Sequence, residues 1–295
     1  MASTAPGPGV ALQHGARAVH LKWHMLRRRP EDPGHQRANL RTGLARGATL
    51  EVDLQFTADG EGVCLHDETL EAETTGRGPV RGLATREVRG LRQRGAGGEP
   101  LAEPPLFLEE VAASVRDAAS ARGAVQLDLK APPEAFDAKA LDRFAAVVRD
   151  VAACFTLSGE EWPLVQRAGR AAPGARLGFE PLRLFERRPP RSAAEVRDLV
   201  ARILAAAPEA EIVYLHAGLA LRALEMGEDP VARLVDAGRI VDCWTVDPHR
   251  TAVAESLARL IGSGCEQVTT NGPEALERLW SERDVRFGSA TGPVP

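Results

Sequence analysis

The chain has 295 residues, a formal net charge of -4 and an isoelectric point near 6.0. This length allows one or two domains and is close to the roughly 250 residues of a single (β/α)8 barrel. The weakly acidic balance, without a sustained basic block, argues against nucleic acid or an anionic membrane surface as a partner, so we expect a small-molecule ligand or another protein.

The chain ends and the cysteines indicate a cytoplasmic protein. The N-terminus lacks the charged and apolar regions of a signal peptide, and no apolar run approaches the ~20 residues of a membrane helix. The four cysteines never form a Cys-x-x-Cys pair, which favours buried thiols in a reducing compartment. Residues 1–17 and 288–295 are rich in Gly, Pro, Ala and Ser, so we expect disordered tails around one domain at 18–287.

Strand-like and helical patterns alternate along this domain. Strand-like runs lie at 18–24, 50–56, 124–130, 151–157, 175–179, 211–216, 240–246 and 266–270. Helical patterns lie at 39–46, 85–94, 106–121, 133–150, 160–171, 192–207, 219–237 and 251–263. A short run at 62–66 follows the turn formers Asp59-Gly60 and predicts a β-hairpin after the second strand. Eight further strands predict a single α/β (β/α)8 TIM barrel; a doubly wound open sheet is the alternative.

The second strand carries two acids on one face. Residues two apart in a strand share a face, so Glu51 and Asp53 point away from the apolar side chains between and beside them. Neighbouring carboxylates shielded from water repel each other, and a divalent cation relieves that repulsion. The hairpin then brings His66, followed by Asp67, close to the same end. We interpret this stretch as a metal site beside a proton-transfer group.

The third strand adds to this chemistry, because barrel active sites lie at the C-terminal ends of the strands. Asp128 and Lys130 share one face of that strand. With Glu51 and Asp53, Asp128 supplies three oxygen ligands for Mg2+ or Ca2+. Lys130 offers a positive charge for a phosphate, and Arg27 after the first strand is a second candidate.

Two histidines are candidates for acid and base catalysis. His24, at the end of the first strand, and His66 come from different strand ends, as in-line displacement at a phosphodiester requires. His35, in the loop after the first strand, competes with His24 as the partner of His66. The remaining histidines are assigned to structure or surface: His14, His20, His216 and His249.

These residues resemble the glycerophosphodiester phosphodiesterase family, whose barrel is of the phosphoinositide-phospholipase-like type. The resemblance covers nearly the whole chain in order and is carried by Glu51-x-Asp53, Thr57-x-Asp59-Gly60, His66-Asp67, Thr74-Thr75-Gly76-x-Gly78, Pro105-Leu106-x-Leu108-Glu109, Leu127-Asp128-Leu129-Lys130, Trp244-Thr245-Val246-Asp247 and Thr270-Asn271-x-Pro273.

The resemblance implies roles for individual residues. Glu51, Asp53 and Asp128 fall at metal-ligand positions, and His66 at one catalytic histidine. Lys130 falls at the phosphate-facing position. An aromatic substrate position and a substrate-binding asparagine correspond to Trp244 and Asn39.

This chain departs from the family pattern in two places. The family's His-Arg-Gly is absent, and His24-Met25-Leu26-Arg27 stands in its place. Asp128 occupies a position where the diesterases usually have Glu, which is similar to the related sphingomyelinase D enzymes. The first departure affects the assignment of phosphate binding around Arg27. The second affects which substrate the resemblance implies.

By this resemblance, the expected reaction is metal-dependent hydrolysis of a glycerophosphodiester to an alcohol and glycerol 3-phosphate. One histidine would deprotonate the attacking water, or the vicinal hydroxyl of the substrate to give a cyclic phosphate, and the other would protonate the leaving alcohol. Two alternatives stay open. One is a sphingomyelinase D-like or lysophospholipase D-like lyase on choline lysophospholipids; the other is a catalytically idle barrel that binds a phosphorylated ligand.

Overall fold

The computed structural model describes residues 7–118 and 122–288. Within these residues ten strands form one sheet, in the order β1-β2-β10-β9-β8-β7-β6-β5-β3-β4, and a further pairing of β2 with β3 closes it. All pairings around the ring are parallel. The parallel strands are β2 (Arg17–Trp23), β3 (Thr49–Phe56), β5 (Val125–Leu129), β6 (Phe155–Ser158), β7 (Arg176–Phe179), β8 (Ile212–His216), β9 (Ile240–Trp244) and β10 (Gln267–Thr270).

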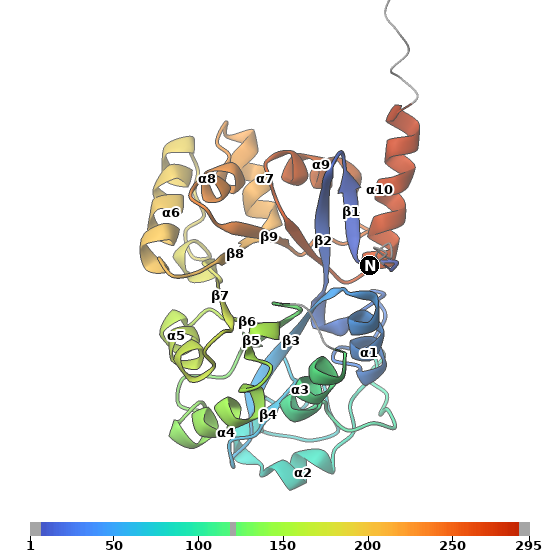
Figure 1. Cartoon of the computed structure of the whole chain (residues 1–295), viewed down its shortest axis with the longest axis vertical. Helices are drawn as coiled ribbons and strands as arrows, with labels where there is room; N and C mark the ends of the chain where they lie inside the picture. Colours follow the sequence, from blue (N-terminus) through green and yellow to red (C-terminus); the bar gives the residue numbers. More distant parts are fainter. Residues whose placement is uncertain (1–6, 119–121, 289–295) are drawn as a thin grey trace, which may run out of the picture.

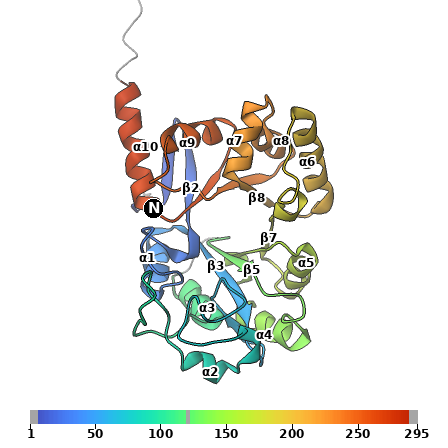
Figure 2. The same cartoon turned by 180° about the vertical axis from the view of Figure 1, so that it is seen from behind.

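Helices surround this closed ring of strands, as Figures 1 and 2 show from opposite sides. The helices are α1 (Arg37–Arg46), α2 (Thr85–Arg89), α3 (Leu108–Asp117), α4 (Ala138–Val148), α5 (Trp162–Ala171), α6 (Ala193–Ala206), α7 (Ala217–Glu225), α8 (Pro230–Asp236), α9 (Val253–Gly262) and α10 (Pro273–Gly288). The predicted (β/α)8 barrel is confirmed, and the closing β2–β3 pair excludes an open sheet. None of the described helices combines the length and apolar character needed to cross a lipid bilayer.

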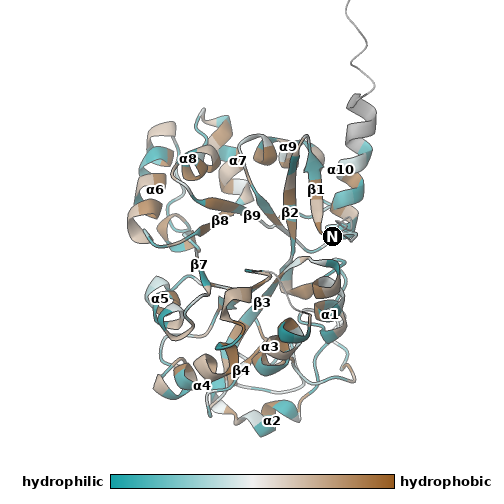
Figure 3. Ribbon diagram, in the orientation of Figure 1, coloured by the Kyte–Doolittle hydropathy of each residue, from teal (hydrophilic) through white to brown (hydrophobic). Residues whose placement is uncertain are grey.

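The core lies between the strands and the helices. On β3, Leu50, Val52 and Leu54 are fully buried in one hydrophobic cluster with helix residues such as Leu40, and the strands are predominantly hydrophobic in Figure 3. Helix α1 packs closely on β3, since a Cβ added at Gly43 would lie 2.5 Å from Leu50 Cδ2. The apolar faces of the strands therefore point to the helices, which leaves the polar faces for the barrel interior.

The N-terminal segment differs from the prediction. The composition of residues 1–17 predicts a disordered tail, but β1 (Ala11–His14) pairs antiparallel with β2, with Leu12 opposite Val19. The indole N–H of Trp23 donates to the carbonyl oxygen of Gly9 at 2.7 Å. Leu12 is buried in the main core, because a short apolar run can pair with an exposed sheet edge despite its Gly-rich flanks. Residues 1–6 and 289–295 lie outside the described part of the chain.

A long excursion, residues 62–107, separates β3 from α3 and bears part of the site. It begins with β4 (Gly62–Val63), which pairs antiparallel with the end of β3 and is shorter than the predicted strand at 62–66. Cys64 leaves that pairing because its N–H donates to the carbonyl oxygen of Leu106 at 2.8 Å. The excursion has a small apolar cluster of its own that includes Leu65, Leu70 and Phe107. This cluster anchors the segment that carries His66.

Replacing Leu12 tests whether β1 belongs to the folded core. Leu12 is 1% exposed, and truncating a buried leucine removes apolar contacts and leaves a cavity, so we expect Leu12→Ala to lower the free energy of unfolding by about 2–4 kcal/mol. Urea unfolding followed by circular dichroism measures this change. The exposed neighbour replaced in Gln13→Ala is the matched control, and equal stability of L12A and the parent chain would show that β1 is dispensable.

Candidate active site

A cavity of about 320 Å3 lies at the C-terminal ends of the barrel strands. Six of the predicted site residues line it: His24, Glu51, His66, Asp128, Lys130 and Trp244. A second cavity of about 280 Å3 lies at the opposite end of the barrel, between the first residues of the strands. Its arginines Arg122 and Arg176 are already paired with Glu211, at 3.3 and 3.2 Å. Because barrel chemistry is found at the C-terminal ends, the first cavity is the candidate site.

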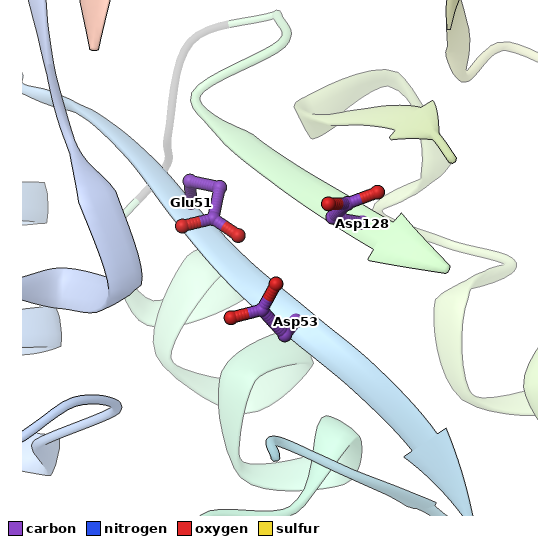
Figure 4. Close-up of side chains that lie close together, drawn as sticks. All are labelled: Glu51, Asp53 and Asp128. Atoms are coloured by element: carbon purple, nitrogen blue, oxygen red, sulfur yellow. The ribbon is translucent and has the colours of Figure 1, made fainter. Parts of the chain in front are cut away.

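Three acids converge on this cavity from two adjacent strands. The register of β3 and β5 sets Asp53 opposite Asp128, and Glu51 lies two residues earlier on the same face of β3. One carboxylate oxygen from each residue lies within 4.8 Å of the others, and Figure 4 shows the three side chains gathered between the strands. All three are at most 3% exposed.

The electrostatics of this cluster favour a bound cation. Burial, with the charges of Asp53 and Asp128, raises the pKa of Glu51 well above its usual value. Three hard oxygen donors that face each other in a low-dielectric interior fit the ligand preferences of Mg2+ and Ca2+. The residues present therefore fit a divalent metal, as the sequence predicts.

Lys130 supplies a positive charge at the edge of the acid cluster. Its Nζ lies 2.5 Å from Asp128 Oδ2 and 3.8 Å from Asp53 Oδ1. Burial lowers the pKa of Lys130, but Asp128 and other nearby carboxylates outweigh burial and raise it. The lysine is therefore charged, and it also lines the cavity. This position suits an anionic group of a ligand.

The turn after β2 places His24 and also contacts the acid cluster. Met25 and Leu26 both have positive φ, at 51° and 59°, a left-handed conformation that costs a non-glycine residue roughly 1–2 kcal/mol. The Met25 N–H donates to Glu51 Oε2 at 2.5 Å, which holds this turn against β3. The turn therefore keeps a conformation suited to glycine, although the His-Arg-Gly motif is absent.

His24 lies in the cavity and its ring is oriented by a chain of polar contacts. Its Nδ1 lies 2.9 Å from Asn271 Oδ1, and the Asn271 amide donates to the Asp247 carboxylate at 3.1 and 3.2 Å. Burial lowers the pKa of His24 below its usual value. A neutral ring with its proton on Nδ1 leaves Nε2 free to accept a proton. Asn271 and Asp247 belong to the sequence motifs, but their role in orienting the His24 ring arises only because the ends of β2, β9 and β10 meet in the fold.

His66 lines the same cavity from the excursion after β4. Its side chain is 48% exposed, and Nδ1 lies 2.8 Å from Asp67 Oδ1. The backbone N–H groups of His66 and Asp67 donate to Glu73 Oε1 at 2.7 and 3.0 Å. Glu73 therefore fixes the backbone of the segment that carries the second histidine.

His35, the competitor of His24, lies behind the acid cluster and not in the cavity. It is completely buried, with Nε2 3.2 Å from Asp53 Oδ2 and Nδ1 3.6 Å from Glu73 Oε2. Burial lowers the pKa of His35, but the contacts with Asp53 and Glu73 outweigh burial and raise the pKa to about 10. His35 thus links a predicted metal ligand to the carboxylate that holds the His66 backbone. Spacing in the sequence does not distinguish this bridging position from a catalytic one.

The structure does not bring Arg27 and Asn39 into the cavity. The Arg27 guanidinium donates from Nε to the carbonyl oxygen of Asp32 at 3.0 Å and from Nη1 to Asn271 Oδ1 at 3.2 Å. Asn39, on α1, donates to Asp32 Oδ2 at 3.2 Å. Both side chains are therefore engaged around Asp32, next to the cavity that they were predicted to line.

A buried polar network forms the floor of the cavity. Lys22 Nζ lies 2.9 Å from Asp242 Oδ2 and also donates to Gln126 Oε1. Gln126 Nε2 donates to Ser158 Oγ at 2.8 Å, and Ser158 Oγ donates to Asp128 Oδ1 at 3.2 Å. The network thus reaches from the barrel interior to one of the converging acids and orients its carboxylate.

Sequence reasoning missed two acids of the cavity, Glu160 and Glu180; Glu160 is paired with Arg183. Glu180 directly follows β7, is 7% exposed and lines the cavity. The signal was an acidic residue at the end of the predicted strand 175–179, a place where barrels keep functional side chains.

The fold and the site define a (β/α)8 barrel with an acidic, metal-type centre and two histidines at the C-terminal strand ends. Residues 38–275 match the model of the Glycerophosphoryl diester phosphodiesterase family. The match spans most of the chain, so the chain belongs to this family of phosphodiesterases. The resemblance drawn from the sequence motifs is confirmed.

Solved structures of similar fold agree with this assignment. One described as a glycerophosphoryl diester phosphodiesterase from Silicibacter pomeroyi has a TM-score of 0.65 at 20% identity, over 93% of this chain and 96% of that one. A glycerophosphodiester phosphodiesterase from Agrobacterium tumefaciens has 0.62 at 20% identity, over 88% and 98%. An Oleispira antarctica phosphodiesterase in complex with the product sn-glycerol-3-phosphate has 0.61 at 17% identity, over 88% and 95%. A search of curated proteins found no match.

The bridging position of His35 predicts an effect on metal binding. In His35→Ala, Asp53 loses the side chain that orients it, so we expect the Kd for Mg2+ or Ca2+ to rise by roughly 10- to 100-fold. Isothermal titration calorimetry on metal-free protein measures this change, with the exposed His20→Ala as control. Unchanged affinity in a folded H35A variant would show that Asp53 needs no such partner.

Proposed function

We propose that this chain hydrolyses glycerophosphodiesters to an alcohol and glycerol 3-phosphate with the help of one divalent cation. The observation that carries the proposal is the meeting of three buried carboxylates with His24 and His66 around one cavity. Family membership supports the reaction class, and the bound product of the Oleispira antarctica phosphodiesterase supports the product.

Glu51, Asp53 and Asp128 would hold the cation. When bound, Mg2+ or Ca2+ supplies Lewis acidity and offsets negative charge on a phosphate oxygen. Lys130 adds a second positive charge on the cavity wall, where it attracts the anionic phosphodiester and stabilises charge that grows on its oxygens.

The two histidines take different roles because their ring nitrogens have different partners. With its proton on Nδ1, His24 donates a hydrogen bond to Asn271 Oδ1, so Nε2 accepts the proton of the attacking hydroxyl. His66 Nδ1 lies 2.8 Å from Asp67 Oδ1, a contact that orients the ring and leaves Nε2 for the substrate in the cavity. Nε2 of His66 then donates a proton to the leaving alcohol oxygen. The attacking hydroxyl belongs either to water or to the glycerol moiety itself, which would give a cyclic phosphate first.

The aspartate at position 128 is the reason to test the lyase alternative as well. Asp128 resembles the acid of the sphingomyelinase D enzymes, so lysophosphatidylcholine belongs among the substrates to be assayed. The idle barrel is disfavoured because the turn that replaces His-Arg-Gly still presents a histidine to the cavity.

Turnover of glycerophosphodiesters tests the proposal directly. Purified protein should release glycerol 3-phosphate from glycerophosphoethanolamine with Mg2+ or Ca2+, and EDTA should abolish the release. Phosphorus NMR separates glycerol 3-phosphate from a cyclic phosphate and shows whether lysophosphatidylcholine is cleaved.

The histidine variants test the assignment of acid and base. His24→Ala and His66→Ala should each lower kcat by roughly 10²- to 10⁴-fold, as expected for the loss of a general acid or base. The exposed His20→Ala is the matched control. Full activity in H66A would refute the proposed mechanism, and no turnover of any diester with either metal would refute the proposed function.

The pH dependence follows from the environment of His24. A general base works only when it is unprotonated, so kcat/KM should fall as the pH drops through the pKa of His24. Burial lowers this pKa below the ordinary 6.5, so the acid limb should lie below pH 6.5. A stopped assay from pH 4.5 to 8 measures it. Asn271→Asp puts a carboxylate beside the ring, should raise its pKa and should move the limb to higher pH.

A further inference from the structure

Glu180 is a buried acid of the cavity that the proposed reaction does not use. It follows the last residue of β7, and its side chain shares the cavity with His24, Lys130 and Trp244. The residue is 7% exposed. Among the described residues, no hydrogen bond or ion pair involves its carboxylate. An unpaired carboxylate at such a depth is costly unless a ligand compensates it.

The other charged groups around the cavity are already compensated. Glu160 Oε2 lies 3.1 Å from Arg183 Nε, and Asp242 is paired with Lys22. The converging acids on β3 and β5 have Lys130 and the proposed cation. Among the acidic side chains that line the described cavity, Glu180 is therefore the one with neither a salt bridge nor a place in the metal site, although the charge of Lys130 acts on it from a distance.

The surroundings of the Glu180 carboxyl group favour the binding of a cationic group beside it. Burial and the nearby Asp128 raise its pKa to about 8, against the opposing effect of Lys130. A cationic group placed beside it would favour the carboxylate and form an ion pair shielded from water.

An aromatic side chain lies on the wall of the same cavity. Trp244 ends β9, and its indole N–H donates to the carbonyl oxygen of Tyr214 at 3.0 Å, which fixes the ring. Leu182 adds apolar surface to the wall. A buried carboxylate together with an aromatic ring is a combination that recognises alkylammonium groups.

We propose that Glu180 and Trp244 bind the amino group of the leaving alcohol, so that this chain prefers glycerophosphodiesters with an ammonium-bearing head group. This inference rests on the proposed function, because it assigns the head-group side of the same cavity. The opposite charges of such a zwitterionic substrate then meet Lys130 at the phosphate and Glu180 at the amine.

A matched pair of substrates isolates the contribution of the positive charge. Glycerophosphoethanolamine and glycerophospho-ethylene glycol differ only in an ammonium group against a hydroxyl group. The parent enzyme should favour the ammonium substrate in kcat/KM by about tenfold or more, and Glu180→Gln should reduce that preference by roughly tenfold or more. The exposed Glu186→Gln, six residues later, should leave the ratio unchanged.

The outcomes separate this inference from the proposed function. The same substrate ratio in E180Q and the parent enzyme would overturn the role of Glu180 while leaving phosphodiester hydrolysis intact. Failure to cleave either substrate with Mg2+ or Ca2+ would overturn hydrolysis itself. Because a variant can fail to fold, inhibition of the parent enzyme is measured as well: ethanolamine should inhibit competitively and ethylene glycol should not, and equal inhibition by both would count against the proposal.

Discussion

Mutual repulsion between Glu51, Asp53 and Asp128 is the constraint around which this end of the barrel is built. Parallel pairing of β3 and β5 brings two of these acids into register on the inward-facing side of the barrel, where all three are at most 3% exposed. Such a cluster is stable only when positive charge and hydrogen-bond donors surround it. The chain supplies them from several directions: Lys130 directly after β5, His35 from the loop before α1, and the Met25 amide from the turn after β2.

The same compensating groups also place the catalytic candidates. The turn that donates to Glu51 carries His24, and the Glu73 carboxylate that contacts His35 also binds the backbone of His66. A change in the acid cluster therefore alters the positions of both histidines through short polar contacts. This arrangement explains how the two candidate histidines are held at one cavity although one comes from a barrel strand end and the other from a long excursion.

The sequence predicts those parts of the site that arise from local alternation or from family motifs. Glu51 and Asp53 follow from the two-residue period of one strand, and the barrel from the count of strand-helix units. Asn271, Asp247 and Glu180 could not be assigned roles, because their contacts join strands far apart in the chain. His24 lines the cavity and His35 is buried behind the acid cluster, a difference that spacing in the sequence alone does not reveal. The strand β1 was missed because Gly and Pro beside it resemble a loose end.

The polar floor of the cavity separates the stability of the fold from the choice of substrate, two properties that mutations usually change together. Lys22, Gln126 and Tyr214 border cavities at both ends of the barrel, so polar groups that solvent approaches from either side fill its middle. Cohesion of the fold then resides mainly in the outer shell, where strands meet helices. Evolution can exchange inward-facing side chains, and with them the accepted alcohol, while the architecture persists. The many chemistries hosted by such barrels are a natural outcome of this division of labour between the two faces of each strand.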